Sequence, residues 1–510
     1  MRWAFVIDNR SCIGCHACST ACKSENEVPL GVYRTWVKTV ESGAFPDVRR
    51  SFQVTRCNHC ENPPCVAICP VKAMYQRPDG IVEFNSDSCI GCKGCLQACP
   101  YDAIHLDPET HTAAKCHFCS HRIDVGLEPA CVVVCPTHSI MAGDLDDPGS
   151  EVSRVLARED AVVRKPEQGT APKLFYIGGR DAGLHPTAST VGASMAAVDG
   201  NKARSARLGG HAQGLPAGGP ITGAGTLAGH LVSYEVTHHA PWHWPIPVYL
   251  ITKAMSAGGM GLLALAALRG GDAFSFEAFR WAAPMAWLAL LVTLGLLVYD
   301  LDRPDRFHYL LLRPQWRSWI ARAAYILTAF FAVSTAWIAA EFLDLTALRI
   351  PLALLTLPLA VASATYTAFL FAQAEGRDYW QSVHLLPVMA AQAAALGGLL
   401  IAAGVIGQVP EAATGLGTNV AVWSCLVGLC TTVVGDAMWP HASEGAVRAA
   451  FSMVRGRWSS FWWGGLVFGW VAPMLLLAVG LAPLALVVGL GGMCLGAWAV
   501  VMAPQDIPNS

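Results

Sequence analysis

The sequence is short of charged residues and has no strong excess of either sign. Only 14% of its 510 residues are Asp, Glu, Lys or Arg, whereas a soluble globular domain usually carries about 25%. Long apolar runs after residue 245 account for the deficit, and the mean hydropathy is +0.40. This half of the chain is therefore not an ordinary soluble domain. The net charge of −2 identifies no partner by itself, and we expect none among nucleic acids.

The N-terminus lacks the features that direct a protein out of the cytoplasm. The residues before Cys12 read MRWAFVIDNRS, with neither an apolar signal core nor a twin arginine. We therefore expect the N-terminal part of the chain to stay on the cytoplasmic side.

Cysteine, by contrast, is abundant and concentrated. Sixteen of the 19 cysteines lie between Cys12 and Cys135, and the other three stand inside apolar runs. The sixteen form four runs: Cys12, Cys15, Cys18 and Cys22; Cys57, Cys60, Cys65 and Cys69; Cys89, Cys92, Cys95 and Cys99; Cys116, Cys119, Cys131 and Cys135. CIGCHACSTAC and CIGCKGCLQAC are nearly the same text, which indicates an internal duplication.

The spacing within these runs favours iron–sulfur clusters. A [4Fe–4S] cube needs four thiolates, and three closely spaced cysteines surround one face of it, with Gly14 or Gly91 easing the turn. Two other chemistries compete. Disulfides need an oxidising compartment and a small secreted fold. Zinc uses C-x2-C pairs, but it requires neither a third cysteine three residues on nor the Cys-Pro ending. Lys93, His59 and His117 are expected to be solvated or hydrogen-bonded to sulfur rather than to be ligands.

Residues 1–180 resemble the four-cluster ferredoxin subunit of complex iron–sulfur molybdoenzymes, the group that includes dimethyl sulfoxide and polysulfide reductases. The resemblance rests on the order of the four runs and implies an α+β, duplicated ferredoxin-like domain. It also implies four [4Fe–4S] clusters and a separate molybdopterin-containing catalytic subunit. The implied ligand sets are Cys12, Cys15, Cys18 with Cys135; Cys116, Cys119, Cys131 with Cys22; Cys57, Cys60, Cys65 with Cys99; Cys89, Cys92, Cys95 with Cys69. AMYQRPDGIVEF and AIHLDPETHTAA predict two hairpins in this domain.

Residues 181–240 are rich in Gly, Ala and Pro, which predicts a tether or an extended surface segment. Residues 241–510 then predict an all-α bundle of eight transmembrane helices, because eight apolar stretches approach the roughly 20 residues that a crossing helix needs. Their expected limits are 246–268, 281–300, 317–340, 350–373, 383–406, 417–435, 461–480 and 484–502.

The segment YDLDRPDRFHYLLLRPQWRSWIARAAYIL follows the second stretch. It resembles the D-L-x-R-P-x-R-F…L-L-x-P signature of NrfD-type (polysulfide reductase anchor) membrane subunits. That resemblance implies a quinone site in an eight-helix bundle, with menaquinone or ubiquinone as the exchangeable substrate. We expect no haem, because the spans hold no histidine pair and His384 has no clear partner.

A quinone pocket needs apolar walls and proton-exchanging groups near the carbonyls. The candidates are His239, His243, Lys253, Asp300, Asp302, Arg303, Arg322 and Tyr325. In the alternative interpretation His243 anchors the interface, Asp300–Arg306 form a structural clasp and Lys253 extends to the membrane surface.

The sequence thus predicts an electron-transfer and quinone-binding subunit of a respiratory oxidoreductase in the bacterial inner membrane. The quinone half-reaction is expected on this chain and the substrate chemistry on the partner. Eight arginines on one side of the spans against three on the other favour a cytoplasmic iron–sulfur domain. The alternatives are a redox-driven proton-translocating complex and a membrane-tethered ferredoxin for soluble partners.

Overall fold

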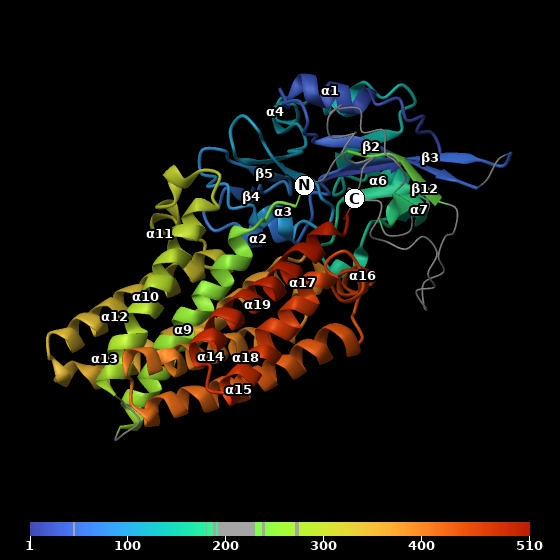
Figure 1. Cartoon of the computed structure of the whole chain (residues 1–510). Coiled ribbons are helices and arrows are strands. Elements are labelled where there is room, and N and C mark those ends of the chain that lie inside the picture. Colours follow the sequence, from blue (N-terminus) through green and yellow to red (C-terminus); the bar gives the residue numbers. More distant parts are fainter. Residues whose placement is uncertain are drawn as a thin grey trace. The chain divides into compact units, whose positions relative to one another are not determined.

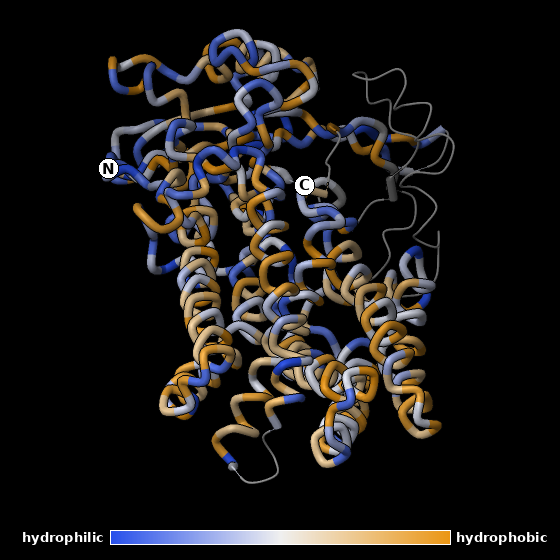
Figure 2. The backbone as a smooth tube through the Cα atoms, turned by 60° about the vertical axis from the view of Figure 1, so that its left-hand side comes forward, coloured by the Kyte–Doolittle hydropathy of each residue, from blue (hydrophilic) through white to orange (hydrophobic). Residues whose placement is uncertain are grey.

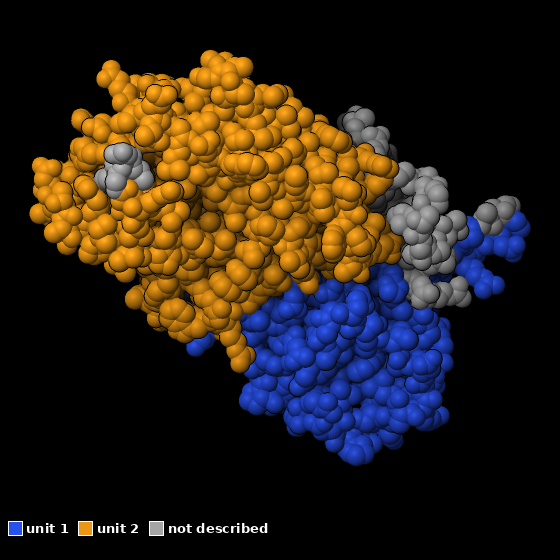
Figure 3. Space-filling model, turned by 90° about the horizontal axis from the view of Figure 1, so that it is seen from below, with its two compact units in different colours: residues 1–241, 374–377, 508–510 blue, residues 242–373, 378–507 orange. Residues whose placement is uncertain are grey.

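The computed structural model describes residues 1–43, 46–179, 181–186, 190–191, 230–236, 240–270 and 275–509. It divides into two compact units, coloured separately in Figure 3. Unit 1 comprises Met1–Pro241, Ala374–Arg377 and Pro508–Ser510, and unit 2 comprises Trp242–Gln373 and Asp378–Ile507. Two short pieces of the second half of the chain therefore belong to unit 1. Within that unit, Arg377 donates to Gln97 Oε1 at 3.0 Å.

Unit 1, whose chain runs from blue to green in Figure 1, contains a four-stranded sheet with the order β8-β1-β10-β9. Its strands are β1 (Trp3–Asp8), β8 (Ile140–Asp144), β9 (Ala161–Val162) and β10 (Leu174–Ile177). β1 runs parallel to β10 and antiparallel to β8. The interior residues of WAFVID are all buried, which explains why this strand is a continuous apolar run rather than an alternating one. Ala4, Val6, Met141, Val152 and Ile177 form the core beside it.

A second sheet has the order β11-β12-β2-β3. Its strands are β2 (Thr35–Ser42), β3 (Arg49–Arg56), β11 (Thr190–Val191) and β12 (His230–Tyr234). β12 pairs antiparallel with β2, so the last residues of the predicted tether belong to a sheet. Helix α7 (Asp181–Leu184) lies at the beginning of the predicted tether. Most of the residues between α7 and β12 lie outside the described ranges.

Both predicted hairpins are confirmed. β4 (Met74–Gln76) pairs with β5 (Val82–Phe84), and β6 (Ile104–Leu106) pairs with β7 (Ala113–Lys115). Six short α-helices and a 3₁₀ helix (Pro166–Gln168) complete the described part of unit 1 before α7, and four of the α-helices carry cysteines of the runs. They are α1 (Ala17–Glu25), α2 (Pro64–Ile68), α3 (Gly94–Ala98), α4 (Ser120–Ile123), α5 (Ala130–Val133) and α6 (Glu151–Leu156).

Unit 2 is helical, and eight of its helical segments are long and apolar enough to cross a membrane. All eight predicted spans are confirmed, at Pro245–Arg269, Phe276–Tyr299, Trp319–Phe342, Thr346–Gln373, Leu385–Gly407, Glu411–Met438, Ser459–Ala478 and Ala482–Asp506. Figure 2 shows apolar residues along the lengths of these helices. The helices are α9 (Pro245–Arg269), α10 (Phe276–Tyr299), α12 (Trp319–Phe342), α13 (Arg349–Gln373), α14 (Leu385–Ala402), α15 (Glu411–Val433), α17 (Ser459–Gly464), α18 (Ala472–Ala478) and α19 (Ala482–Met502). Shorter helices α11 (Tyr309–Leu312) and α16 (Glu444–Val454) lie between spans.

Helix α9 is central to unit 2, because it packs against α10, α13, α14 and α19. The contact with α14 is made through glycine. A Cβ atom on Gly258 would collide with the carbonyl of Ala393, and one on Gly397 would collide with the backbone of Gly258. Small residues allow such close approach of two membrane helices.

We expect the substitution Gly258→Ala to destabilise unit 2, because the added methyl group overlaps backbone that cannot rotate away. Overpacking of this kind costs roughly 1–3 kcal/mol, and a lower midpoint of thermal unfolding of the solubilised chain would report it. Gly295→Ala in α10 is the control, since nothing lies within 4 Å of its added Cβ. Equal unfolding midpoints for the two variants would contradict the close contact of α9 with α14.

Candidate functional site

The cysteines of unit 1 gather into four groups, each combining three cysteines of one run with the last cysteine of another. Site 1 (Cys12, Cys15, Cys18, Cys135) and site 2 (Cys22, Cys116, Cys119, Cys131) each line one pocket. At site 3 (Cys57, Cys60, Cys65, Cys99) and site 4 (Cys69, Cys89, Cys92, Cys95) the thiols are close enough for their charges to interact. These groups coincide with the four sets that the resemblance to the ferredoxin subunits implies.

The four sites adjoin one another in series. Cys18 of site 1 lies near Cys131 of site 2. Cys116 of site 2 lies near Cys57 of site 3, and Cys65 of site 3 lies near Cys95 of site 4. The order is therefore site 1, site 2, site 3, site 4.

The two duplicated runs share one backbone conformation. Gly14 and Gly91 have φ values of +66° and +68°, and the residues two positions later, His16 and Lys93, have φ values of +59° and +61°. A side chain on Gly14 would also overlap the ring of Phe52. Glycine is required there for both reasons, and the repeated turn directs successive cysteines to one side.

A second turn follows the Cys-Pro ending of three runs. The third residue after the last cysteine is left-handed in each case: Lys72, Asp102 and His138, with φ values of 58°, 48° and 51°. This turn directs the next N–H back onto the sulfur. Ala73 N donates to Cys69 Sγ at 3.2 Å and Ser139 N donates to Cys135 Sγ at 3.2 Å. Such donors stabilise negative charge on sulfur and tune a bound cluster.

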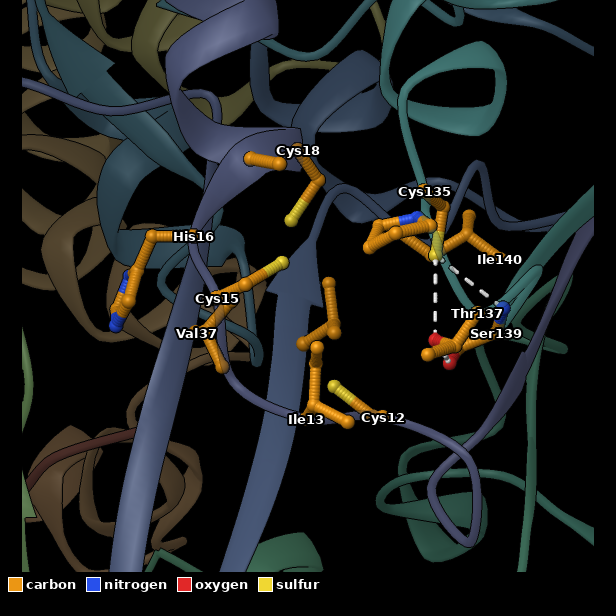
Figure 4. Close-up of a pocket in the computed structure, with 13 residues that line it drawn as sticks. Cys12, Ile13, Cys15, His16, Cys18, Val37, Cys135, Thr137, Ser139 and Ile140 are labelled. Atoms are coloured by element: carbon orange, nitrogen blue, oxygen red, sulfur yellow. Dashed lines mark hydrogen bonds between the residues drawn. The ribbon is translucent and has the colours of Figure 1, made fainter.

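Sites 1 and 2 are hollows lined by cysteines and apolar side chains, and both hollows are partly open to solvent. Figure 4 shows the cysteine sulfurs of site 1 turned toward this space, with Thr137 and Ser139 beside Cys135. Among the described residues, no three His, Cys, Asp or Glu side chains are placed to share a single metal ion. Four thiols around one hollow are the donor set that an iron–sulfur cube takes.

Burial makes these thiols poor acids when nothing is bound to them. It raises the pKa of Cys18 to about 11 and that of Cys22 to about 12. Metal ligation requires the thiolate and releases the proton, so ligation and folding of this domain are coupled.

The histidines beside the cysteines accept hydrogen bonds from backbone N–H groups. His59 is buried and its Nδ1 accepts from Val82 N at 3.1 Å. Burial lowers the pKa of His117 to about 3, so its ring is neutral and Nδ1 accepts from Cys119 N at 3.1 Å. Their contacts hold the loops that carry Cys60 and Cys116.

In unit 2 the polar residue Lys253 lies deep in α9. It is 2% exposed, donates to Thr367 Oγ1 on α13, and its ammonium stands 4.3 Å from the ring centroid of Tyr366. Tyr249, one turn earlier, is buried as well. Lys253 therefore does not extend to the membrane surface, and it forms a buried polar group with α13.

The other quinone candidates have different surroundings. Arg303 pairs with Asp305 at 3.0 Å. Arg322 donates to Trp316 O at 2.6 Å and Tyr325 donates to Leu311 O at 2.7 Å, so both hold the loop before α12. Asp300 and Asp302 are half-buried, His243 is exposed, and His239 lies outside the described residues.

Sequence reasoning missed a buried polar group around Asp436. Its carboxylate accepts from Tyr379 OH and from Trp462 Nε1 at 2.7 Å, and it pairs with His384 Nε2 at 2.9 Å. His384 thus has the partner that the sequence did not reveal. The expected span ended at residue 435, but a π-helical segment, Val434–Met438, continues α15 and places Asp436 inside it. An acidic residue directly after an apolar run was the available signal.

Comparison with known families separates the same two parts. Residues 48–145 match the family described as 4Fe-4S dicluster domain, and residues 233–502 match the family described as Polysulphide reductase, NrfD. The second match covers more than half of the chain.

Individual proteins match about a third of the chain. A tetrathionate reductase subunit from Salmonella typhimurium is 47% identical over 189 residues, 36% of this chain and 76% of that protein. A polysulfide reductase component from Wolinella succinogenes is 45% identical over 186 residues, 36% of this chain and 97% of that protein. Protein NrfC of Escherichia coli is 43% identical over 180 residues, 35% of this chain and 81% of that protein.

Proposed function

The chain belongs to the polysulphide reductase NrfD family and carries a 4Fe-4S domain in the same polypeptide, and from this premise we propose that it connects a catalytic partner to membrane quinone. All sixteen cysteines of sites 1–4 would hold four [4Fe–4S] clusters, which supply one-electron transfer when bound. The observation that carries the proposal is the series of four adjoining cysteine sites. Electrons pass between two distant reactants through a chain of closely spaced redox centres.

Site 1 is the end of the series that suits a partner protein. Cys15 is exposed, unlike the cysteines of sites 2 and 3, and the neighbouring Ile13 is 57% exposed. An exposed apolar residue beside an exposed ligand fits a docking surface. We propose that a molybdopterin-containing catalytic subunit docks there, in keeping with relatives that are named as components of reductases.

The proposed quinone pocket includes Lys253. A buried ionisable residue within a membrane helix is a functional candidate, and its neighbours Thr367 and Tyr366 supply the polar and aromatic contacts that a quinone head group needs. The loop from Asp300 to Tyr325, whose arginines are largely held by carbonyls and carboxylates, would border the pocket. Menaquinone and ubiquinone both fit this chemistry.

Reoxidation of the clusters by quinone tests the proposal. In membranes containing the full complex, added menaquinone or ubiquinone should oxidise dithionite-reduced clusters, as followed by their visible absorbance. Clusters that stay reduced with either quinone would instead favour a tethered ferredoxin for soluble partners.

The substitution Lys253→Met should slow this quinone reaction at least about tenfold, because it removes a charged hydrogen-bond donor worth roughly 1.5 kcal/mol or more. Ser256→Ala, one turn further along α9 and also buried, is the control and should react normally. The pocket assignment fails if the two variants react equally fast.

We propose that unit 1 lies on the cytoplasmic face of a bacterial inner membrane. Unit 1 precedes the first of the eight spans in the sequence. Loops on the side where that span begins carry Arg303, Arg306, Arg313, Arg317, Arg377, Arg448, Arg455 and Arg457, and the opposite loops carry Arg269, Arg280 and Arg349. Basic residues concentrate in cytoplasmic loops. A cysteine-labelling reagent that cannot cross membranes should leave a cysteine placed at Lys165 unlabelled in intact cells.

Proton translocation is a second candidate function, favoured by the buried group of Asp436, His384 and Tyr379 within unit 2. Protons moved in sealed vesicles beyond those of quinone chemistry would support it.

A further inference from the structure

Arg56 is a buried cation whose surroundings contain sulfur rather than carboxylate. It is 0% exposed, at the end of β3. Its Nη1 donates to Cys131 Sγ at 2.9 Å, and the guanidinium stands 4.6 Å from the ring centroid of Phe5. Among the described residues, its buried Nε and Nη2 atoms have no hydrogen-bond partner.

A buried guanidinium needs a negative neighbour, because an unpaired charge is costly away from water. The groups whose charges favour the cation most are all thiols: Cys131 and Cys116 of site 2, followed by Cys18 of site 1. Arg56 also lines the pocket at site 2. The negative charge that compensates it would therefore be the charge of metal-bound thiolates and of a cluster held at site 2.

We propose that Arg56 sets the reduction potential of the cluster at site 2 and, less strongly, that of the cluster at site 1. Reduction adds one negative charge to a cluster, and a fixed cation in contact with a ligand sulfur stabilises that added charge. The guanidinium would therefore raise the midpoint potential of site 2. The inference rests on the proposed function, because it requires a cluster at each site.

The same strand supplies a matched control. Arg50 lies on β3 as well, but its side chain is 60% exposed and pairs with Glu41 at 2.6 Å. Solvent and the carboxylate screen its charge. Arg50→Gln should therefore leave all four midpoint potentials unchanged.

The test is a redox titration of the full complex in membranes, followed by electron paramagnetic resonance. Arg56→Gln should lower one midpoint potential by more than about 59 mV, a tenfold change in a one-electron equilibrium. A second midpoint should fall by less, and the other two should stay in place. Arg56→Lys, which keeps the positive charge, should remain closer to the parent protein than Arg56→Gln.

Two results would overturn the inference: unchanged midpoints in Arg56→Gln, or equal shifts in Arg56→Gln and Arg56→Lys, which would indicate a role in packing alone. If Arg56→Gln fails to assemble a cluster, the Arg56→Lys variant tests the inference instead. Cluster assembly in Arg56→Lys supports the role of Arg56 as a counter-charge, and failure of assembly in both variants overturns that role. Absence of cubane signals from the unmodified protein would instead refute the proposed function.

Discussion

On the proposed function, replacing Cys60 by alanine should interrupt electron transfer between the catalytic partner and quinone. Cys60 belongs to site 3, which lies between site 2 and site 4 in the series. Loss of its cluster leaves a gap across which transfer is slow. We expect turnover with quinone to fall at least about 100-fold, more than the roughly 10–100-fold losses that follow when only the outer-shell contacts of a metal site are altered.

The variant should also divide the remaining clusters into two sets. A substrate-derived electron entering at site 1 should reduce sites 1 and 2, and a quinol should reduce only site 4. Electron paramagnetic resonance after each reductant distinguishes the sets, with dithionite as the reductant that reaches all of them. Cys430→Ala is the control, because Cys430 is an exposed residue of α15 outside the four sites. Reduction of sites 1 and 2 by quinol in Cys60→Ala would contradict the order of the sites.

The second large effect is expected at Asp436. Asp436→Ala removes the acceptor shared by Tyr379, Trp462 and His384. The buried donors Tyr379 and Trp462 and the half-buried His384 would then lose their charged acceptor. Removing one member of a buried charged pair costs roughly 3–5 kcal/mol, so the thermal unfolding midpoint of the solubilised chain should fall clearly. Asp436→Asn, which keeps the volume and one acceptor oxygen, should lose less.

Asp506 offers a matched comparison. It accepts from Trp458 Nε1 at 2.7 Å, as Asp436 accepts from a tryptophan, but its side chain is 19% exposed against 2% for Asp436. Water can replace its contacts, so Asp506→Ala should cost about 1 kcal/mol or less. Equal losses of stability in Asp436→Ala and Asp506→Ala would contradict the prediction that the more deeply buried carboxylate contributes more.

Local patterns in the sequence were sufficient for several features. The hairpins at residues 73–84 and 103–114 were predicted because turn residues and short extended runs act over a few positions. The eight spans were predicted because a membrane-crossing helix must be apolar over its own length. Neither feature depends on which distant residues become neighbours.

The pairing of polar residues was not predictable in the same way. Lys253 contacts Thr367, 114 positions away, and Arg56 contacts Cys131, 75 positions away, although Cys57 is adjacent to it in sequence. His384 had no visible partner, because Asp436 enters the span only through the π-helical continuation of α15. Each of these contacts depends on helix packing or on strand and loop placement that no single segment encodes.

The sequence by itself therefore determined the two-part architecture, the four cysteine runs and the eight spans, because spacing and hydropathy act within one segment. Only the tertiary structure decided the order of the four sites, the cation beside site 2 and the buried groups of Lys253 and Asp436. A buried charge must find its partner wherever packing brings one, and that placement is a property of the whole fold.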